Sequence, residues 1–307
     1  MAEIIIFSHY GNSDYLNFTL QCARITNQDA RLVLLGDDSN LAVAERWGWE
    51  HYNFSNFKSS LLDRFDKVYK PVQGVKHQNI KGGKDWLRYV FERWFFIEEF
   101  VTQQGIKRFW HFDSDTMILK DLKSYDEALV RYDFSAQCNG SCLNGIISTQ
   151  VASEYCVHIC DLFDNLSYIA KQQIEFDTIN PSYAFTEMRA FEHYIQQTNR
   201  PWKHLLTYQN DMIFDDCICQ DHGFEMCELK NGQVVKRFFS RQGNVYANSG
   251  GKEVEFVTLN LSWVPIFVFE WALSALNGIN SSVDNAPCPF SESVLTIARK
   301  FKRLLIK

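Results

Sequence analysis

The chain has 307 residues, of which 46% are hydrophobic and 15% aromatic, and its net charge at pH 7 is −6. This is enough apolar material for a large core, and the length suits one large domain or two modest ones. The acidic balance argues against a nucleic-acid binder, which would need a basic face to collect phosphates. No run reaches the roughly 18 apolar residues that a membrane span requires.

The N-terminal residues and the cysteines predict a cytoplasmic protein. Glu3 stands where a secretory signal needs positive charge, and the apolar run after it is too short for such a signal. The nine cysteines are an odd number, and we expect them to remain reduced thiols.

Strands and helices alternate in the first part of the chain. Residues 3–7 and 31–38 are apolar runs typical of buried parallel strands, and helical patterns follow them at 14–25 and 39–48. This alternation predicts the α/β class, with a mostly parallel, Rossmann-like central sheet flanked by helices. The clearest helix spans 85–105, after which residues 106–112 form a further strand.

Later elements are predicted from shorter patterns. They are strands at 133–137, 143–149 and 253–263, helices at 151–166 and 186–197, and a hairpin over 224–240 around Asn231-Gly232. Residues 291–307 form a basic amphipathic helix. This terminal helix either makes a peripheral contact with the inner face of the membrane or packs on the body or on a partner chain.

Two acids, Asp113 and Asp115, directly follow the strand at 106–112, at the carboxyl end where α/β sheets bind ligands. On an extended segment residues two apart point the same way, so we expect both carboxylates to converge, with Ser114 facing away. Convergent carboxylates suit Mg²⁺ or Mn²⁺, which would offset their repulsion and keep positions open for phosphate oxygens. The alternative is a pair of solvated loop acids.

The segments RWFFIEEF (93–100) and FWHFDSDTMIL (109–119) resemble the core of nucleotide-sugar-dependent glycosyltransferases of the GT-A fold, and distantly the glycogenin-like members. The order of features is similar over residues 1–265, although only 88–119 is specific. The resemblance implies a metal on Asp113 and Asp115 that grips the donor diphosphate. It also implies a donor such as a UDP-sugar, an acceptor hydroxyl on a glycan or lipid-linked glycan, one domain over 1–265 and a helical extension over 266–307.

The resemblance assigns further residues to the donor and the metal. Those expected near the donor are Ser8, His9, Tyr10, Asp37, Asp38, Arg93, Ser114, Asn144 and Gly145. Tyr10 would stack on the base, and an acid after the second strand suits a ribose hydroxyl or a uracil N–H. Asn144 and Gly145 could instead form an ordinary turn. Arg93 could instead pair with a glutamate of its own helix.

A third metal ligand and a catalytic acid are also implied. Asn260 stands where glycogenin-like members place a histidine ligand, and His222 is its rival. Glu187 would be the general base of an inverting enzyme or would stabilise an oxocarbenium-like state in a retaining one. It could also simply complement a helix dipole. Asp211 is its substitute, ahead of the neighbouring acids at 215 and 216.

Three alternatives remain open. Cys217, Cys219, His222 and Cys227 are close enough to suggest zinc, although their spacing fits no common structural site and free thiols are favoured. A nucleotidyltransferase or pyrophosphatase would use the same paired acids. A non-catalytic module could bind nucleotides or carbohydrates with the same fold.

Overall fold

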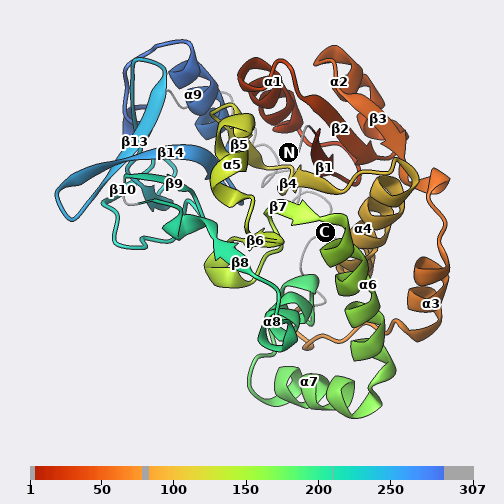
Figure 1. The fold of residues 1–307 in the computed structure, drawn as a ribbon. Coiled ribbons are helices and arrows are strands. Elements are labelled where there is room, and N and C mark those ends of the chain that lie inside the picture. The colour runs from red at the N-terminus through yellow and green to blue at the C-terminus, as the bar shows by residue number, and fades with distance from the viewer. Residues whose placement is uncertain (1–3, 78–82, 210, 287–307) are drawn as a thin grey trace, which may run out of the picture.

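The computed structural model describes residues 4–77, 83–209 and 211–286. A seven-stranded sheet lies at its centre, in the order β3-β2-β1-β4-β7-β6-β8 (Figure 1). The strands are β1 Ile4–Ser8, β2 Arg31–Gly36, β3 Glu50–Asn53, β4 Arg108–His111, β6 Phe134–Ala136, β7 Gly145–Ser148 and β8 Trp202–His204. Only β7 runs antiparallel to its neighbours, β4 and β6. The sheet is therefore mostly parallel.

Helices cover both faces of this sheet because alternate residues of its strands point to opposite sides. Ile4 and Ile6 pack in one buried cluster with α3 (Ser60–Val68), α4 (Gly83–Gln103), α6 (Thr149–Asp164) and α8 (Glu187–Gln197). Ile5 and Phe7 pack in another with α1 (Leu16–Thr26), α2 (Leu41–Arg46) and α5 (Asp126–Leu129). Burial on both faces explains the continuous apolar run of β1 and confirms the predicted fold class.

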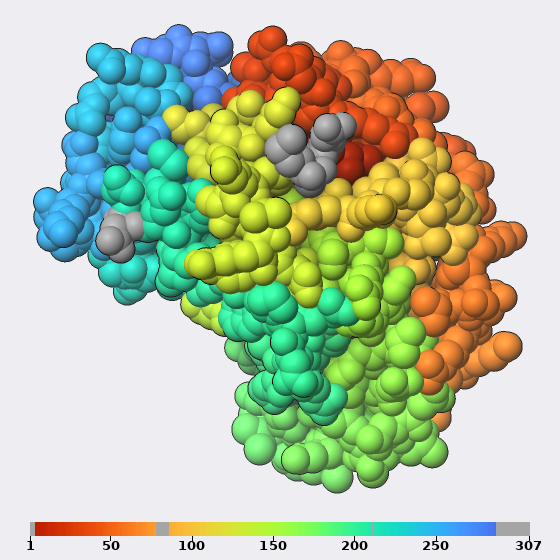
Figure 2. Space-filling view, in the orientation of Figure 1, coloured from red at the N-terminus to blue at the C-terminus, as the bar shows by residue number. Residues whose placement is uncertain are grey.

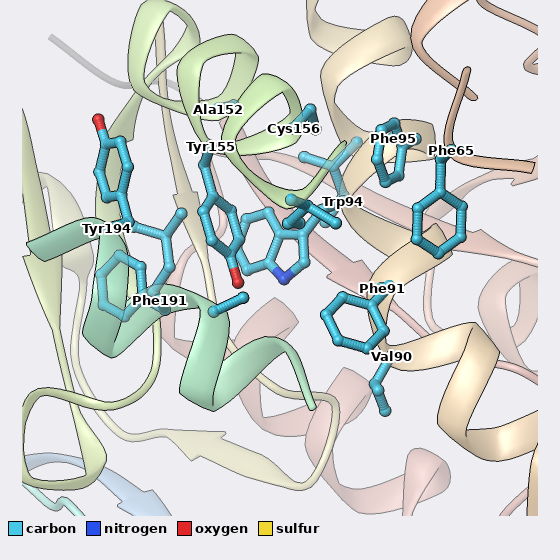
Figure 3. Packing of buried hydrophobic residues seen from close by; sticks show 14 of the residues in the cluster. Phe65, Val90, Phe91, Trp94, Phe95, Ala152, Tyr155, Cys156, Phe191 and Tyr194 are labelled. Atoms are coloured by element: carbon cyan, nitrogen blue, oxygen red, sulfur yellow. The ribbon is translucent and has the colours of Figure 1, made fainter. Parts of the chain in front are cut away.

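An aromatic cluster holds α4, α6 and α8 together (Figure 3). The Trp94 ring of α4 meets Tyr155 of α6 edge to face, with ring centroids 5.5 Å apart. Phe191 of α8 meets the same tyrosine at 5.5 Å. Such pairs add about 0.5–1.5 kcal/mol each beyond burial. The cluster therefore fixes the two helices that carry Arg93 and Glu187.

A second sheet is built mainly from the C-terminal part of the chain, which Figure 2 shows in cyan and blue at one side of the molecule. Its order is β12-β13-β14-β5, and β9 pairs with β14. The strands are β5 Thr116–Ile118, β9 Met212–Phe214, β12 Phe239–Arg241, β13 Asn244–Ser249 and β14 Lys252–Asn260. Helix α9 (Ile266–Leu276) packs against this sheet and α1. Because β5 directly follows β4 in the chain, residues 112–115 join the two sheets.

Most predicted elements are present in the described residues. The hairpin is confirmed as β10 (Met226–Glu228) and β11 (Val234–Lys236). Helices α3 and α7 (Leu166–Thr178) were not predicted, although Leu61, Leu62, Phe65 and Val68 of α3 recur at helical spacing. The predicted strand over 253–263 stops at Asn260. Short 3-10 helices lie at Asp38–Asn40, Phe54–Asn56, Leu122–Tyr125, Cys138–Gly140, Leu205–Thr207 and Val283–Asn285.

Two predictions concern the C-terminal end of the chain, namely the helical extension and the basic terminal helix. Helix α9 lies inside the predicted extension over 266–307. The predicted basic helix over 291–307, with its membrane contact, lies outside the described residues. Among the helices that the structure describes, none combines the length and the apolar character that crossing a bilayer demands.

Candidate active site

The paired acids occupy a tight turn between the two sheets. Thr116 N donates to Asp113 O at 2.9 Å, which places Ser114 and Asp115 at the centre of the turn. We call residues 113–116 the D-x-D turn. The prediction of an extended segment is therefore wrong, although the two carboxylates are near enough for Asp113 to raise the pKa of Asp115. The chain must reverse here because β5 leaves the central sheet to pair with β14.

Asp113 faces helix α4 and strand β7. Arg93 Nη1 donates to Asp113 Oδ1 at 2.6 Å, and Asn144 Nδ2 donates to Asp113 Oδ2 at 3.4 Å. Burial alone would raise the pKa of Asp113, but the adjacent guanidinium outweighs it and holds that pKa below its ordinary value. Asp113 is therefore ionised, and Arg93 balances its charge.

Asp115 faces the second sheet and has surplus acceptor capacity. Ser262 Oγ donates to Asp115 Oδ2 at 3.0 Å, while Oδ1 is buried without a hydrogen-bond partner among the described residues. Ser262 Oγ also lies 2.6 Å from Asn260 Oδ1, yet a hydroxyl has one proton to donate. Burial, reinforced by repulsion from Asp113, raises the pKa of Asp115 to about 7. The site lacks positive charge at this point.

These residues fit a hard divalent cation. Among the described residues, Asp115 Oδ1 has no hydrogen-bond partner, and the one hydrogen bond to Asp113 Oδ2 is a long one from Asn144. Carboxylate and amide oxygens are ligands that Mg²⁺ and Mn²⁺ accept. In the part of the chain that the structure describes, no group of three or more His, Cys, Asp or Glu side chains could hold a metal. A third protein ligand would therefore be an amide or hydroxyl oxygen. Asn260 Oδ1 is a candidate, because the Ser262 hydroxyl contacts both it and Asp115 Oδ2.

Glu187 lies at the first turn of α8, within reach of the same arginine. Arg93 Nη2 donates to Glu187 Oε1 at 2.9 Å. Glu187 Oε2 is buried without a hydrogen-bond partner among the described residues. Burial raises the pKa of Glu187 to about 7, although Arg93 opposes the shift. The pairing of Arg93 with a glutamate of its own helix is thus wrong. The arginine instead bridges Asp113 and Glu187, beside a small cavity that Asn144 also lines.

Ser114 connects the D-x-D turn to the end of β1. Its Oγ lies 2.9 Å from His9 Nδ1 and 3.3 Å from the Tyr15 hydroxyl. Burial lowers the pKa of His9 to about 4, so the imidazole is neutral. Ser8, the last residue of β1, is buried. This uncharged network fixes the turn without neutralising its acids.

Residues after β1 and β2 form a second polar group. Asp37 accepts hydrogen bonds from Gly11 N at 2.6 Å and from Ser39, and Asp38 accepts from Asn53 at 2.6 Å. Both predicted ribose acids therefore already have donors within the protein. Tyr10 is 65% exposed, with its ring 5.5 Å from that of Tyr89, so one aromatic face remains accessible.

Gly145 has a packing reason to be glycine. Its φ is +94°, and an added Cβ would lie 2.2 Å from Ser135 Oγ and 2.5 Å from Leu205 Cδ1. Glycine is therefore required at the start of β7 whatever the strand binds. Asn144, immediately before it, is the residue whose side chain reaches Asp113.

The remaining acids divide between the two ends of β14. Asp211 is exposed and lies beside Glu255, five residues before Asn260 along the strand, roughly 16 Å away. This placement does not support Asp211 as a substitute for Glu187. Asp215 and Asp216 instead lie at the site end, where Asp215 Oδ2 accepts from Asn260 N at 3.1 Å and Asp216 O accepts from Asn260 Nδ2 at 3.0 Å.

Several residues at the site carry no sequence signal. Ser262 and Lys236 are ordinary residues in the sequence, yet Ser262 contacts Asp115 and the fully buried Lys236 Nζ lies 2.6 Å from Asp215 Oδ1. His222 Nε2 lies 3.2 Å from Asn139 Oδ1, and His222 Nδ1 lies 3.3 Å from Lys236 Nζ. Its hydrogen-bond partners among the described residues are therefore not the D-x-D acids. Zinc at the cysteine cluster likewise gains no support among the described residues.

No protein-family model matches the chain, and no curated protein matches it. Solved structures with similar folds include an active-site mutant of LgtC, with 12% identity, 68% of this chain and 75% of that chain covered, and a TM-score of 0.40. The glycosyltransferase GlyE of Streptococcus pneumoniae TIGR4 shares 11% identity over 67% of this chain and 45% of that chain, with a TM-score of 0.34. A cytidylyltransferase from Leptospira borgpetersenii serovar Hardjo-bovis shares 12% identity over 66% of this chain and 76% of that chain, with a TM-score of 0.33. Likeness at this level says nothing about the chemistry of this chain.

Proposed function

We propose that the protein is a metal-dependent glycosyltransferase that moves a sugar from a nucleotide-diphosphate donor, with UDP as the favoured nucleotide, to a hydroxyl of a glycan or lipid-linked glycan. The observation that carries the proposal is the acceptor surplus at the D-x-D turn. Three carboxylates (Asp113, Asp115 and Glu187) lie in or beside the D-x-D turn, and the Arg93 guanidinium pairs with two of them, which leaves a charge of −2 when all are ionised. A divalent cation matches that charge and gives an acidic protein a way to hold a diphosphate.

The bound cation would be held by Asp113 and Asp115, with Asn260 Oδ1 as the candidate third ligand, and would supply Lewis-acid stabilisation of the leaving diphosphate. Arg93 fixes Asp113 on one side and Glu187 on the other, so the metal side and the acceptor side share one anchor. Asn144 limits the rotation of Asp113 through its 3.4 Å contact.

Glu187 has properties that suit proton transfer. Its pKa near 7 matches a general base at neutral pH, and Oε2 is free of hydrogen bonds from described residues. In an inverting reaction the acceptor O–H proton passes to Glu187 as the acceptor oxygen bonds to the anomeric carbon. The bond from that carbon to the diphosphate breaks, and its electron pair leaves with the diphosphate. In a retaining reaction the same carboxylate would stabilise positive charge on the sugar ring.

Calorimetric titration of UDP with and without Mn²⁺ is the first test, and tighter binding with the metal is expected. The second test incubates a panel of UDP- and GDP-sugars with the protein and Mn²⁺. A glycosyltransferase slowly releases free sugar and nucleoside diphosphate, whereas a pyrophosphatase releases the nucleoside monophosphate and the sugar 1-phosphate. A binding module gives neither product.

Matched variants make these tests specific. Asp113→Asn should abolish the metal enhancement and the turnover. Asp161→Asn removes an acid that is 58% exposed and paired with Arg64, and it should change neither. Equal binding of UDP with and without metal would refute the proposal.

A further inference from the structure

Trp263 occupies a conformation and a position that packing does not explain. It is 84% exposed, the highest value among the exposed large hydrophobic residues of the described chain. Its φ is +67°, in the third position of a turn that Val264 N closes onto Leu261 O at 3.4 Å. That position favours glycine or asparagine, and a bulky residue there is strained. No burial offsets the strain, and strained residues of this kind cluster at functional sites.

Uncharged polar side chains extend from the same turn. Gln233 Nε2 lies 3.3 Å from Trp263 O and 3.3 Å from Cys219 Sγ. Next along the chain, Gln220 Oε1 accepts from Asn139 Nδ2 at 3.2 Å, and Asn139 Oδ1 lies 3.2 Å from His222 Nε2. We call Asn139, Gln220, His222 and Gln233 the polar belt.

The polar belt is neutral. Lys236 Nζ lies 3.3 Å from His222 Nδ1, so this ring nitrogen faces an ammonium group and acts as an acceptor of an uncharged imidazole. Lys236 itself is fully buried and paired with Asp215. The belt therefore presents amides and an imidazole, which both donate and accept hydrogen bonds, and offers an anionic ligand no cation.

Trp263 and the polar belt adjoin the D-x-D turn. Ser262, the residue before Trp263, contacts Asp115. On the other side, Asn139 N donates to the carboxylate of Asp216, whose carbonyl accepts from Asn260. Loops that follow β6, β9 and β14 and the loop of the β10–β11 hairpin all meet here. Asn139 and His222 also have positive φ, at +56° and +45°.

We infer that Trp263 and the polar belt bind a pyranose ring of a neutral acceptor saccharide, with the ring's C–H face on the indole and its hydroxyls on the belt. This inference rests on the proposed function, because it takes the reacting site to be at the D-x-D turn. An exposed indole with a polar edge is an efficient rigid anchor, since it offers large area and few rotatable bonds. Amides and a neutral imidazole satisfy hydroxyl groups without the desolvation cost of a charge.

The test observes the tryptophan indole N–H resonances of the ¹⁵N-labelled protein during titration with lactose, maltose, cellobiose and N,N′-diacetylchitobiose. At least one disaccharide should shift the Trp263 signal and leave that of Trp86, a 39% exposed tryptophan on α4, unchanged. Trp263→Gly should weaken that binding about tenfold, the loss expected for an aromatic anchor. Trp263→Tyr should retain most of it.

Trp263→Gly also separates ligand binding from folding, because glycine relieves the positive φ and should leave the melting temperature equal or higher. Metal-dependent UDP binding by the same variant should equal that of the wild type. Failure of every disaccharide to shift Trp263, unchanged disaccharide affinity in Trp263→Gly, or a loss of UDP affinity in that variant would overturn the inference. Failure of the proposed function would be seen separately, as metal-independent UDP binding by the wild-type protein.

Discussion

The Arg93 guanidinium lies 2.6 Å from the Asp113 carboxylate, although 20 residues separate them in the chain. The pair joins α4 to the D-x-D turn, and the second nitrogen of the same guanidinium extends the link to Glu187. The side chain of Arg93 is only 11% exposed, so both bonds are shielded from water and screened little by salt. The Arg93 side chain therefore sets the positions of both Asp113 and Glu187. The proposed reaction gives these acids different tasks, metal binding for Asp113 and proton transfer for Glu187.

Arg93→Gln should lower kcat/KM of the proposed transferase by about 10²–10³-fold, because it releases both Asp113 and Glu187 from a preorganised arrangement. Arg88→Gln on the same helix is the control. Arg88 is 39% exposed and pairs with Asp66 and Glu92 near the surface. Steady-state kinetics with a donor sugar measure both variants. Equal losses in both would show that the effect comes from α4 stability and not from the bridge.

Asp115→Asn should raise the melting temperature of the metal-free protein, because it removes a carboxylate that is poorly solvated and repelled by Asp113. The same variant should lose stabilisation by Mn²⁺ and UDP. For the wild type that stabilisation is about 2.7 kcal/mol at a ligand concentration 100 times Kd. Thermal unfolding with and without ligand measures both effects. A variant that is still stabilised by metal would place the cation elsewhere.

Glu187 should give the reaction and the fold opposite pH dependences. If it is the general base, turnover falls as the pH drops through about 7, where the carboxylate becomes protonated. Stability behaves differently. Between pH 4.5 and about 7 the folded protein holds a proton at Glu187 that the unfolded chain has lost, so stability decreases as pH rises through this window.

Glu187→Gln should therefore raise the free energy of unfolding by about 1–3 kcal/mol at pH 8 and leave it nearly unchanged at pH 4. Urea unfolding at the two pH values measures the difference. A gain of equal size at both would mean that the effect comes from packing and not from ionisation.

Lys236→Met should destabilise the protein by about 3–5 kcal/mol, because it leaves the fully buried Asp215 without its cation. Adding Asp215→Asn should recover a large part of that loss. The amide removes the charge, and its oxygen can still accept from Asn260 N, as Asp215 Oδ2 does now at 3.1 Å. Chemical unfolding of the single and double variants completes the cycle. Additive losses would mean that the pair is not coupled.

The sequence by itself determined the elements that carry the site. The apolar runs of β1 and β2, the helical period of α4 and the acids after β4 are local patterns, and local patterns fix local structure. The alternation of strands and helices also determined the α/β class, and the sequence placed two acids at the carboxyl end of β4.

Only the tertiary structure decided how the acids are partnered. Arg93 and Glu187 are 94 residues apart, and Asp115 and Ser262 are 147 apart, so no local pattern relates them. The turn at 113–116 arises because β5 pairs with β14, a strand that the chain reaches more than a hundred residues later. The packing of the two sheets thus sets which acid is neutralised, which is left in surplus and where Trp263 is exposed. Long-range contacts of this kind depend on the whole fold and not on the residues nearby in sequence.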